Sequence, residues 1–184
     1  NLKKQFTRSF PFIGESDVIK KVREQISRLA TVDEDIFLIG ETGTGKEVAA
    51  NYYYIYSPRF GKPFHTVNCS ALSETLIESE LFGHIKGSFT SADRSKTGFF
   101  EECSSGILFL DEVTNLSLLS QSKILRAIEN KEIQIVGGNL KKVDTRLIFA
   151  SNAGLDKLSE ESIFRKDLFY RIEGNIVELP PLRE

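Results

Sequence analysis

The stretch LIGETGTGKEVAA, residues 38–50, decides how the rest of the sequence is interpreted. Its glycines and lysine fit the spacing G-x-x-x-x-G-K, in which a glycine-rich turn between a strand and a helix cradles phosphate groups. A Ser or Thr usually follows the lysine, and its hydroxyl holds Mg²⁺, whereas this chain has Glu47 there. Gly40, Gly45 and Lys46 therefore indicate a nucleotide site in which a carboxylate replaces the usual hydroxyl.

The residues on both sides of this loop have the patterns that a phosphate-binding loop needs. The apolar run 36–39 predicts a buried strand, and 46–56 predicts a helix. Glycines let the backbone turn its N–H groups inward, and the start of the helix adds positive dipole. Lys46 would reach the β- and γ-phosphates as a point charge. The expected nucleotide contacts are Gly40, Glu41, Thr42, Gly43, Thr44, Gly45, Lys46 and Glu47.

A second apolar run, ILFLDE at 107–112, ends in two acidic residues. It predicts a buried strand that presents Asp111 and Glu112 at its end. Asp111 would hold Mg²⁺, directly or through water, and Glu112 would polarise the attacking water. Glu47 would keep another oxygen near the metal, and its charge is favourable in the first turn of a helix. Together with the phosphate loop, the acidic pair predicts hydrolysis of a nucleoside triphosphate.

Strand and helix patterns alternate along the rest of the chain. Further strands are predicted at 64–68, 146–152 and 175–179, and helices at 16–30, 73–83 and 116–131. In the first helix Val18, Val22, Ile26 and Leu29 have helical spacing, and Ser16 or Asp17 could cap it. The apolar residues of the helix at 116–131 are Leu118, Leu119, Ile124, Leu125 and Ile128. Residues 132–144 indicate a strand–turn excursion. The alternation predicts an α/β fold with a mainly parallel five-stranded sheet flanked by helices on both faces.

Length and composition exclude several classes of protein. The chain has 184 residues, about the size of one domain, and a net charge of −2, which does not suggest a surface for nucleic acid or anionic lipid. No apolar run approaches the roughly 18 residues of a membrane helix, and no signal peptide opens the chain. The absence of Met and the first residue, Asn1, indicate a piece of a longer protein, with 1–11 as a linker.

The cysteines and histidines do not have metal-ligand spacing. Cys69 and Cys103 are expected to be reduced and half-buried, as in a cytosolic protein. His65 and His84 have no partner pattern for a metal either.

Several motifs together resemble the central AAA+ domain of sigma-54-dependent transcriptional activators, the bacterial enhancer-binding proteins. They are GETGTGKE (40–47), ESELFGH (78–84), ILFLDE (107–112) and FRKDLFYRI…LPPLRE (164–172 and 179–184). The resemblance runs from about Phe12 to the end of the chain. It implies an AAA+ P-loop NTPase fold with ATP and Mg²⁺ as cofactors, in which Glu at the end of the P-loop is usual. It also implies that the helical lid of the family is absent from this chain.

The identifying loop of that family, G-A-F-T-G-A, contacts sigma-54 and reads GSFTSA here. Phe89 and Thr90 match the residues that touch the sigma factor. Ser88 replaces Ala and Ser91 replaces the second Gly, which narrows the backbone conformations that the loop can adopt. The sigma-54 contact implied by the resemblance comprises Gly87, Ser88, Phe89, Thr90, Ser91 and Ala92.

Four further residues receive roles from the resemblance. Asn152 looks like the sensor of the γ-phosphate, and Asn68 resembles an Asn that holds Glu112 in an inactive pose until ATP binds. Arg165 and Arg171 resemble arginine fingers that reach the ATP of a neighbouring subunit. The two arginines need not share a helical face, so we expect a loop or a helix start between them.

These features predict a cytoplasmic bacterial ATPase that assembles into a ring, expected to be a hexamer, and remodels sigma-54 RNA polymerase holoenzyme. DNA would be bound through a C-terminal domain outside this chain, and no membrane is involved. Two alternatives remain open. One is a nucleotide-gated binding module without turnover, and the other is an AAA+ ATPase of another branch that does not act on sigma-54.

Overall fold

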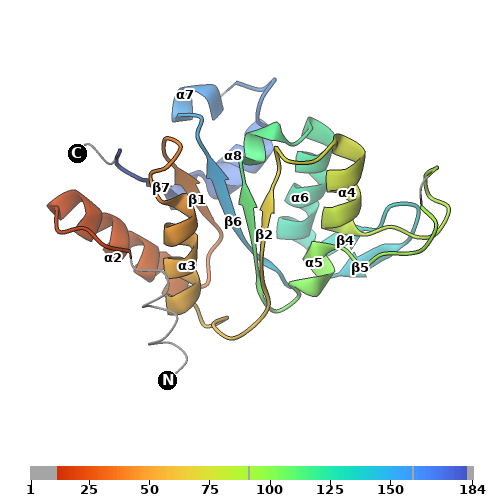
Figure 1. Ribbon diagram of the computed structural model, residues 1–184, viewed down its shortest axis with the longest axis horizontal. Helices are drawn as coiled ribbons and strands as arrows, with labels where there is room; N and C mark the ends of the chain where they lie inside the picture. The colour runs from red at the N-terminus through yellow and green to blue at the C-terminus, as the bar shows by residue number, and fades with distance from the viewer. Residues whose placement is uncertain (1–11, 91, 159, 182–184) are drawn as a thin grey trace.

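The computed structural model of the chain describes residues 12–90, 92–158 and 160–181. The expected linker at 1–11, Ser91 and residues 182–184 lie outside the described residues. The described chain forms three layers, with a parallel sheet between two sets of helices (Figure 1). Among these residues, no helix has the length and hydrophobicity that a bilayer crossing requires.

The sheet has the strand order β2-β3-β6-β1-β7, and each described pair of neighbours is parallel. Its strands are β1 (Ile36–Ile39), β2 (Phe64–Asn68), β3 (Ile107–Asp111), β6 (Arg146–Ser151) and β7 (Ile176–Glu178). Each lies within a segment that the sequence predicts as a strand. The predicted five-stranded parallel sheet is therefore confirmed.

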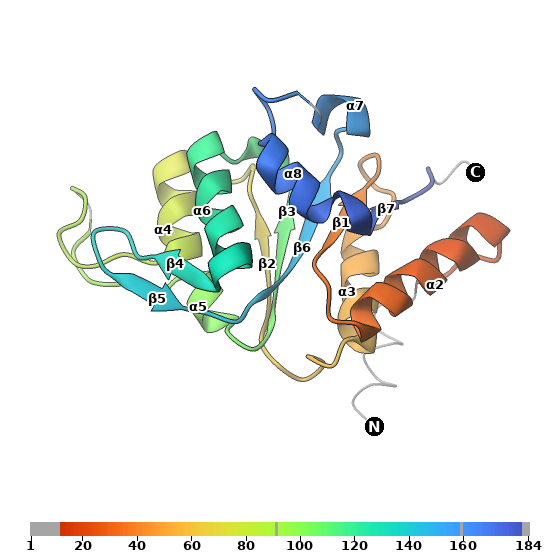
Figure 2. The ribbon, with the colours of Figure 1, turned by 180° about the vertical axis from the view of Figure 1, so that it is seen from behind.

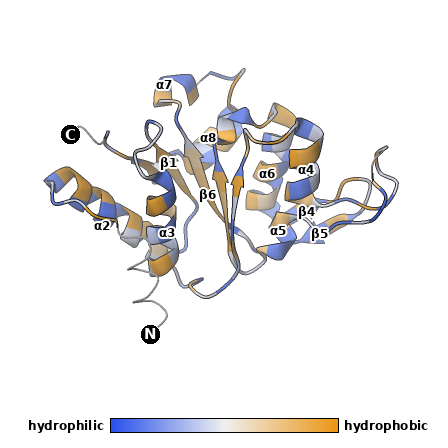
Figure 3. Cartoon of the chain, viewed as in Figure 1, coloured by the Kyte–Doolittle hydropathy of each residue, from blue (hydrophilic) through white to orange (hydrophobic). Residues whose placement is uncertain are grey.

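Residues along each strand alternate between two hydrophobic cores. In β1, Ile36 and Leu38 pack with α2 (Asp17–Thr31) and α3 (Lys46–Tyr56). Phe37 and Ile39 belong to the core on the other face. The helices of that face are α4 (Glu74–Phe82), α5 (Phe99–Glu102), α6 (Leu118–Asn130) and α8 (Lys166–Ile172). Figure 2 shows α8 crossing in front of the sheet, and Figure 3 shows that the helices carry both hydrophilic and hydrophobic residues, as expected for helices with one buried face.

A hairpin, a short α-helix and two 3-10 helices, η1 (Val113–Asn115) and η2 (Glu173–Asn175), complete the described fold. The segment predicted as a strand–turn excursion is an antiparallel hairpin of β4 (Glu132–Gln134) and β5 (Leu140–Lys142). The helix α7 (Leu155–Leu158) follows β6. The sequence patterns did not predict α5, α7 or α8, because each is short and carries too few residues for a clear helical period.

The buried faces of two helices differ from the predicted ones. Val18 is 54% exposed, and Ile19 instead packs against the core in the first turn of α2. In α6, Leu118 and Leu119 are exposed, whereas Gln121 is fully buried. The Gln121 amide donates hydrogen bonds to two backbone carbonyls, which satisfies its polar atoms inside the core.

Both cysteines are free and buried, more deeply than the half-buried positions expected from the sequence. They belong to the core cluster that contains Leu108 and Leu110. Burial raises the pKa of the Cys69 and Cys103 thiols to about 12, so both remain protonated at neutral pH.

A network of ion pairs joins the segments that precede β1, β2 and β6. Arg59 donates to both carboxylate oxygens of Asp33, with a shortest distance of 2.9 Å, and to the backbone oxygen of Asp144 at 2.7 Å. Arg146 donates to Asp33 at 3.2 Å and pairs with Asp35 at 3.1 Å. Burial alone would raise the pKa of Asp33, but hydrogen bonds from Arg59 and Arg146 outweigh it and hold that pKa below its ordinary value.

We expect Asp33→Asn to lower the free energy of unfolding by about 2 kcal/mol at pH 7, because two largely buried guanidinium groups would lose a shared carboxylate. The pKa of Asp33 is lower in the folded chain, so its stabilisation is present above the ordinary value of 3.8 and is lost as the pH falls through the lowered folded value. Denaturant unfolding between pH 7 and pH 3 measures both effects, and the variant should lose less stability in acid than the parent chain.

Asp17→Asn is the matched control, because Asp17 is exposed and, among the described residues, its one ion pair is with Lys20 at 3.5 Å. It should change the free energy of unfolding by less than about 0.5 kcal/mol. Equal losses in the two variants would contradict a stabilising role for the Asp33 network.

Candidate active site

The segments that follow β1, β2, β3 and β6 meet at one edge of the sheet, because carboxyl ends of parallel strands lie together (Figure 1). Asn68 and Asp111 are neighbours in the pairing of β2 with β3. In the same way, Ile39 of β1 lies beside Ser151 of β6, which immediately precedes Asn152. The fold therefore brings residues that are distant in sequence to one place.

The glycine loop after β1 has the backbone conformation expected for a phosphate cradle. Gly43 and Gly45 have φ of 86° and 90°, in the left-handed region that favours glycine. A Cβ on Gly40 would come 2.6 Å from Thr44 Oγ1, so this position also requires glycine. Within the described chain, the amides of Gly43, Gly45, Lys46 and Glu47 donate to no acceptor. These N–H groups at the start of α3 are available to an anion.

Lys46 connects the loop to the acidic pair. Its Nζ donates to the carbonyl oxygens of Gly40 at 2.8 Å and Glu41 at 3.3 Å. The same nitrogen lies 4.0 Å from Glu112 Oε1, although β6 separates β1 from β3 in the sheet. The Lys46 side chain is only 8% exposed. The structure thus places Lys46 and the Asp111–Glu112 pair in one site.

Glu112 is held in an uncommon backbone conformation at the end of β3. Its φ of 53° lies in the left-handed region, which costs a residue with a Cβ roughly 1–2 kcal/mol. Its amide donates to Asp111 Oδ1 at 3.0 Å, and its carboxylate accepts from the backbone N–H of Asn152 at 3.4 Å. The carboxylate therefore lies between Lys46 and the segment after β6. Backbone strain of this kind is concentrated at functional sites.

The acidic residues fit a magnesium ion better than a metal held by protein ligands alone. No group of three or more His, Cys, Asp or Glu that could hold a metal occurs among the described residues. Mg²⁺ usually takes only one or two carboxylates and completes its shell with water and phosphate oxygens. Asp111 is half-buried at the site, and Glu47 is exposed in the first turn of α3. These two carboxylates match that donor set.

The contacts of Asn68 and Asn152 in this structure are not the side-chain contacts that their expected roles require. Asn68 Oδ1 accepts from Ser70 N at 2.9 Å and Ser70 Oγ at 2.7 Å, so in this conformation it stabilises its own turn rather than Glu112. Its NH₂ group is the part that could donate to a carboxylate. At Asn152 the backbone amide, not the side chain, contacts Glu112.

Arg165 and Arg171 lie at opposite ends of α8, with the helix start between them as expected. Arg165 forms a two-pronged ion pair with Asp167 at 3.0 and 2.6 Å, and its backbone N–H donates to the buried Gln121 side chain at 2.9 Å. Arg171 is exposed. Among the described residues, neither arginine bonds to the glycine loop or to Glu112.

The GSFTSA loop emerges between α4 and α5, on the far side of the molecule from α2 (Figure 1). Gly87, with φ of 81°, donates from its amide to the Ala92 carbonyl at 2.9 Å. The Phe89 ring lies edge-on to His84, with centroids 4.9 Å apart. Ser88 and Thr90 belong to the described part of the loop, whereas Ser91 does not.

Two supports of this loop were missed by the sequence analysis. His84 is buried and hydrogen-bonds Ser79 Oγ at 2.7 Å and the Arg94 carbonyl at 2.8 Å, which ties the loop base to α4. The β4–β5 hairpin lies alongside, and the Ile85 amide donates to Val136 O at 3.1 Å. A Cβ on Gly137 would come 2.6 Å from Ser88 Cβ. The glycine pair in the hairpin is the sequence signal for this close approach.

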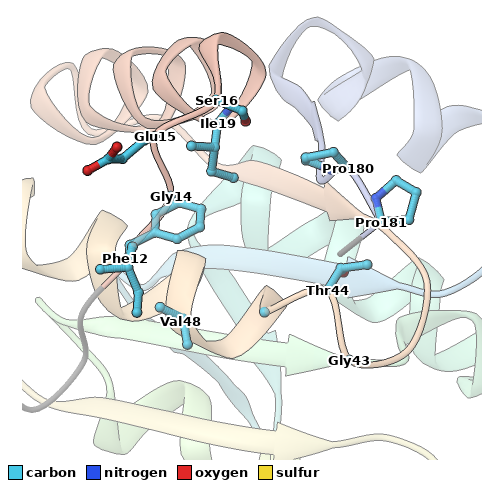
Figure 4. A pocket seen from close by; sticks show the side chains of 12 residues that line it. Phe12, Gly14, Glu15, Ser16, Ile19, Gly43, Thr44, Val48, Pro180 and Pro181 are labelled. Carbon is cyan, nitrogen blue, oxygen red and sulfur yellow. The ribbon is translucent and has the colours of Figure 1, made fainter. Parts of the chain in front are cut away.

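A cavity of about 350 Å³ adjoins the glycine loop and was not predicted. Its apolar walls come from three separated segments, as Figure 4 shows. Phe12, Ile13 and Ile19 lie before and within α2, Val48 lies in α3, and Pro180 and Pro181 follow β7. The sequence signals for this cavity were Gly14, whose φ in the structure is 146°, and the pair Pro180–Pro181. A flat heteroaromatic group would suit this mostly apolar cavity.

Comparisons with known proteins were consistent with this geometry. Residues 12–178 match the model of the Sigma-54 interaction domain. The Psp operon transcriptional activator of Escherichia coli (strain K12) is 44% identical over 173 residues, which are 94% of this chain and 53% of that protein. A Nif-specific regulatory protein of Rhodobacter capsulatus is 48% identical over 172 residues, 93% of this chain and 30% of that protein. The chain spans about half or less of these relatives.

Solved structures agree in fold. NtrX from Brucella abortus in complex with ADP has a TM-score of 0.84 at 33% identity, over 97% of this chain and 39% of that one. The structure of NtrX with ATP gives 0.83 at 34% identity, over 98% and 39%. A P-loop NTPase domain from E. coli, at 19% identity and a TM-score of 0.64 over 92% of this chain and 99% of that one, shares the fold. Through the match over residues 12–178, the chain belongs to the sigma-54 interaction domain family.

Proposed function

We propose that the chain binds Mg–ATP at the carboxyl edge of its sheet and hydrolyses it to remodel sigma-54 RNA polymerase. The observation that carries the proposal is the position of Lys46, whose Nζ lies between the glycine-loop carbonyls and the Glu112 carboxylate. A cation there can exchange its carbonyl contacts for phosphate oxygens. Homologous NtrX structures were determined with ADP and with ATP, which supports a nucleotide at the corresponding position.

The nucleotide would extend from the cavity to the acidic pair. The base would occupy the apolar cavity beside Val48, and the phosphates would accept hydrogen bonds from the free amides at the start of α3. Asp111 and Glu47 would hold Mg²⁺, which neutralises phosphate charge when bound. Glu112 would accept a proton as water attacks the γ-phosphorus and the bond to the bridging oxygen breaks, giving ADP and phosphate.

Groups outside this set would regulate the reaction. Asn152 follows β6 beside Glu112 and could report the γ-phosphate. Asn68 could turn its NH₂ group toward Glu112, once its contact with Ser70 is released. These changes of hydrogen-bond partner would make the conformation at the strand ends depend on whether the γ-phosphate is present. The change would reach the GSFTSA loop through α4.

Arg165 and Arg171 would act on the ATP of an adjoining copy in a ring. In the part of the chain that the structure describes, neither bonds to its own glycine loop, and α8 presents them at its two ends. Arginine fingers contribute roughly 10³–10⁵ in rate. A single copy should therefore bind ATP and hydrolyse it slowly. The full-length protein would bind DNA through a domain outside this chain.

Glu112→Gln should retain ATP binding and lower turnover by about 10² or more, because an amide cannot accept the proton of the attacking water. Fluorescent-nucleotide titration and phosphate release at high protein concentration measure the two properties. Lys46→Ala should lose binding, and Glu102→Gln, a change of the same kind on α5, should alter neither. Undiminished turnover in Glu112→Gln would refute the role of Glu112. Binding without turnover in the parent chain would instead favour a nucleotide-gated module.

A mixture of Lys46→Ala and Arg165→Ala chains should hydrolyse ATP faster than the sum of the separate variants. The first supplies an intact finger and the second an intact nucleotide site, so only a mixed interface combines them, with an effect of up to about 10³. Phosphate release is measured at concentrations where light scattering shows assembly. Arg126→Ala, at an exposed position of α6, is the control, and its rate of ATP hydrolysis should equal that of the parent chain. Rates equal to the sum would contradict a finger acting between copies.

Phe89→Ala should weaken binding to purified sigma-54 about tenfold or more without changing ATP hydrolysis, because the aromatic ring supplies most of the apolar contact area of the loop. A pull-down in the Glu112→Gln background, with ATP present, holds the nucleotide uncleaved. Leu119→Ala, which truncates a side chain that is 62% exposed on α6, is the control. Equal binding by both variants would argue against the loop contact. No binding by the parent chain would favour an AAA+ ATPase of another branch.

A further inference from the structure

Arg23 of α2 touches the wall of the cavity but has no part in the function proposed above. Its Nη1 donates to the Phe12 carbonyl and its Nη2 to the Gly14 carbonyl, both at 2.8 Å. Within the described residues Arg23 has no carboxylate partner. Its two-pronged guanidinium is therefore committed to the backbone of the segment that precedes α2.

These two hydrogen bonds fix the orientation of the peptide groups in the wall. A trans peptide is planar, so the direction of the Phe12 carbonyl also sets the direction of the Ile13 N–H. The Gly14 carbonyl sets the Glu15 N–H in the same way. The Ile13–Gly14 peptide group lies between these two oriented peptide groups. In the described chain the Ile13 N–H and the Ile13 carbonyl have no hydrogen-bond partner, so both are available to a bound group.

The same segment is also held by apolar contacts, and Phe12 packs against the core cluster that includes Val22 and Ala49. A Cβ on Gly14 would come 2.7 Å from Ile19 Cγ2, so the backbone already lies as close to α2 as glycine allows. Phe12 packs edge-on against Tyr52 of α3, with ring centroids 5.4 Å apart. The Ile13 side chain is 80% exposed. Without the guanidinium, apolar contacts of Phe12 and Gly14 with α2 and α3 would still hold the wall, but in the described chain they do not fix the direction of its carbonyl groups.

We propose that Arg23 is a positioning residue for the nucleobase: it preorganises residues 12–14 as the wall of the base cavity and does not act on the phosphates. This inference rests on the proposed nucleotide function. Preorganisation strengthens binding by removing the cost of ordering the segment when the ligand arrives. The effect should therefore depend on the base, because the phosphates would contact the glycine loop, to which Arg23 makes no hydrogen bond among the described residues.

Arg23→Ala should weaken ADP and ATP binding about tenfold and leave the affinity for inorganic tripolyphosphate unchanged. Calorimetric titration of the three ligands measures this split. In phosphate release, KM for ATP should rise while kcat stays within about twofold. The nucleotide affinity of Arg23→Lys should lie between those of the parent chain and Arg23→Ala, because an ammonium group can donate a short hydrogen bond to one of the two carbonyls but not to both.

Arg28→Ala, an exposed arginine of the same helix, should match the parent chain for all three ligands. Lys46→Ala should lose both nucleotide and tripolyphosphate, which separates a defect of the phosphate site from a defect of the base wall. Equal weakening of ADP and tripolyphosphate by Arg23→Ala, or no weakening of either, would overturn the proposal. A parent chain that binds tripolyphosphate but not ADP would overturn it too, whereas one that binds neither would first refute the nucleotide function itself.

Discussion

The placement of the Lys46 ammonium between the glycine-loop carbonyls and the Glu112 carboxylate is the constraint on which the site depends. The two halves belong to β1 and β3, which are not neighbours in the sheet, and β6 lies between them. Only a parallel sheet with all three strands in register brings their carboxyl ends to one level. The largely buried lysine also keeps the anionic Glu112 close to the loop, where phosphates would compete for the same cation.

The two edges of the sheet use charge in different ways. At the amino edge, Arg59 and Arg146 form ion pairs with Asp33 and neighbouring acidic residues, and these pairs hold the connections together, although Arg146 Nε has no hydrogen-bond partner in the described chain. At the carboxyl edge, amides at the start of α3 have no acceptor within the described chain, and Glu112 has a strained backbone. The ion pairs at the amino edge support the fold, whereas the amides and the strained backbone at the carboxyl edge are suited to bind a ligand.

Sequence reasoning succeeded where one local signal sufficed and failed where packing chose between similar residues. The strands and the glycine loop were predicted because their apolar runs and glycines admit few alternatives. The sequence did not predict that Val18 and Leu119 are exposed or that Gln121 is buried, because the inward face of a helix depends on what packs against it. Asn68 Oδ1 accepts from Ser70 in this structure, and the expected contact of its side chain with Glu112 stays a prediction.

The sequence by itself determined the α/β class, the order of the strands along the chain, the phosphate loop and the acidic pair. Each depends on spacing within a short segment, where backbone geometry leaves little choice. Only the tertiary structure decided that Lys46 meets Glu112, that Phe12 and Pro180 line one cavity, and that Arg23 holds its wall. Those contacts join residues far apart in the chain, and no local periodicity records them because they arise from the packing of whole elements.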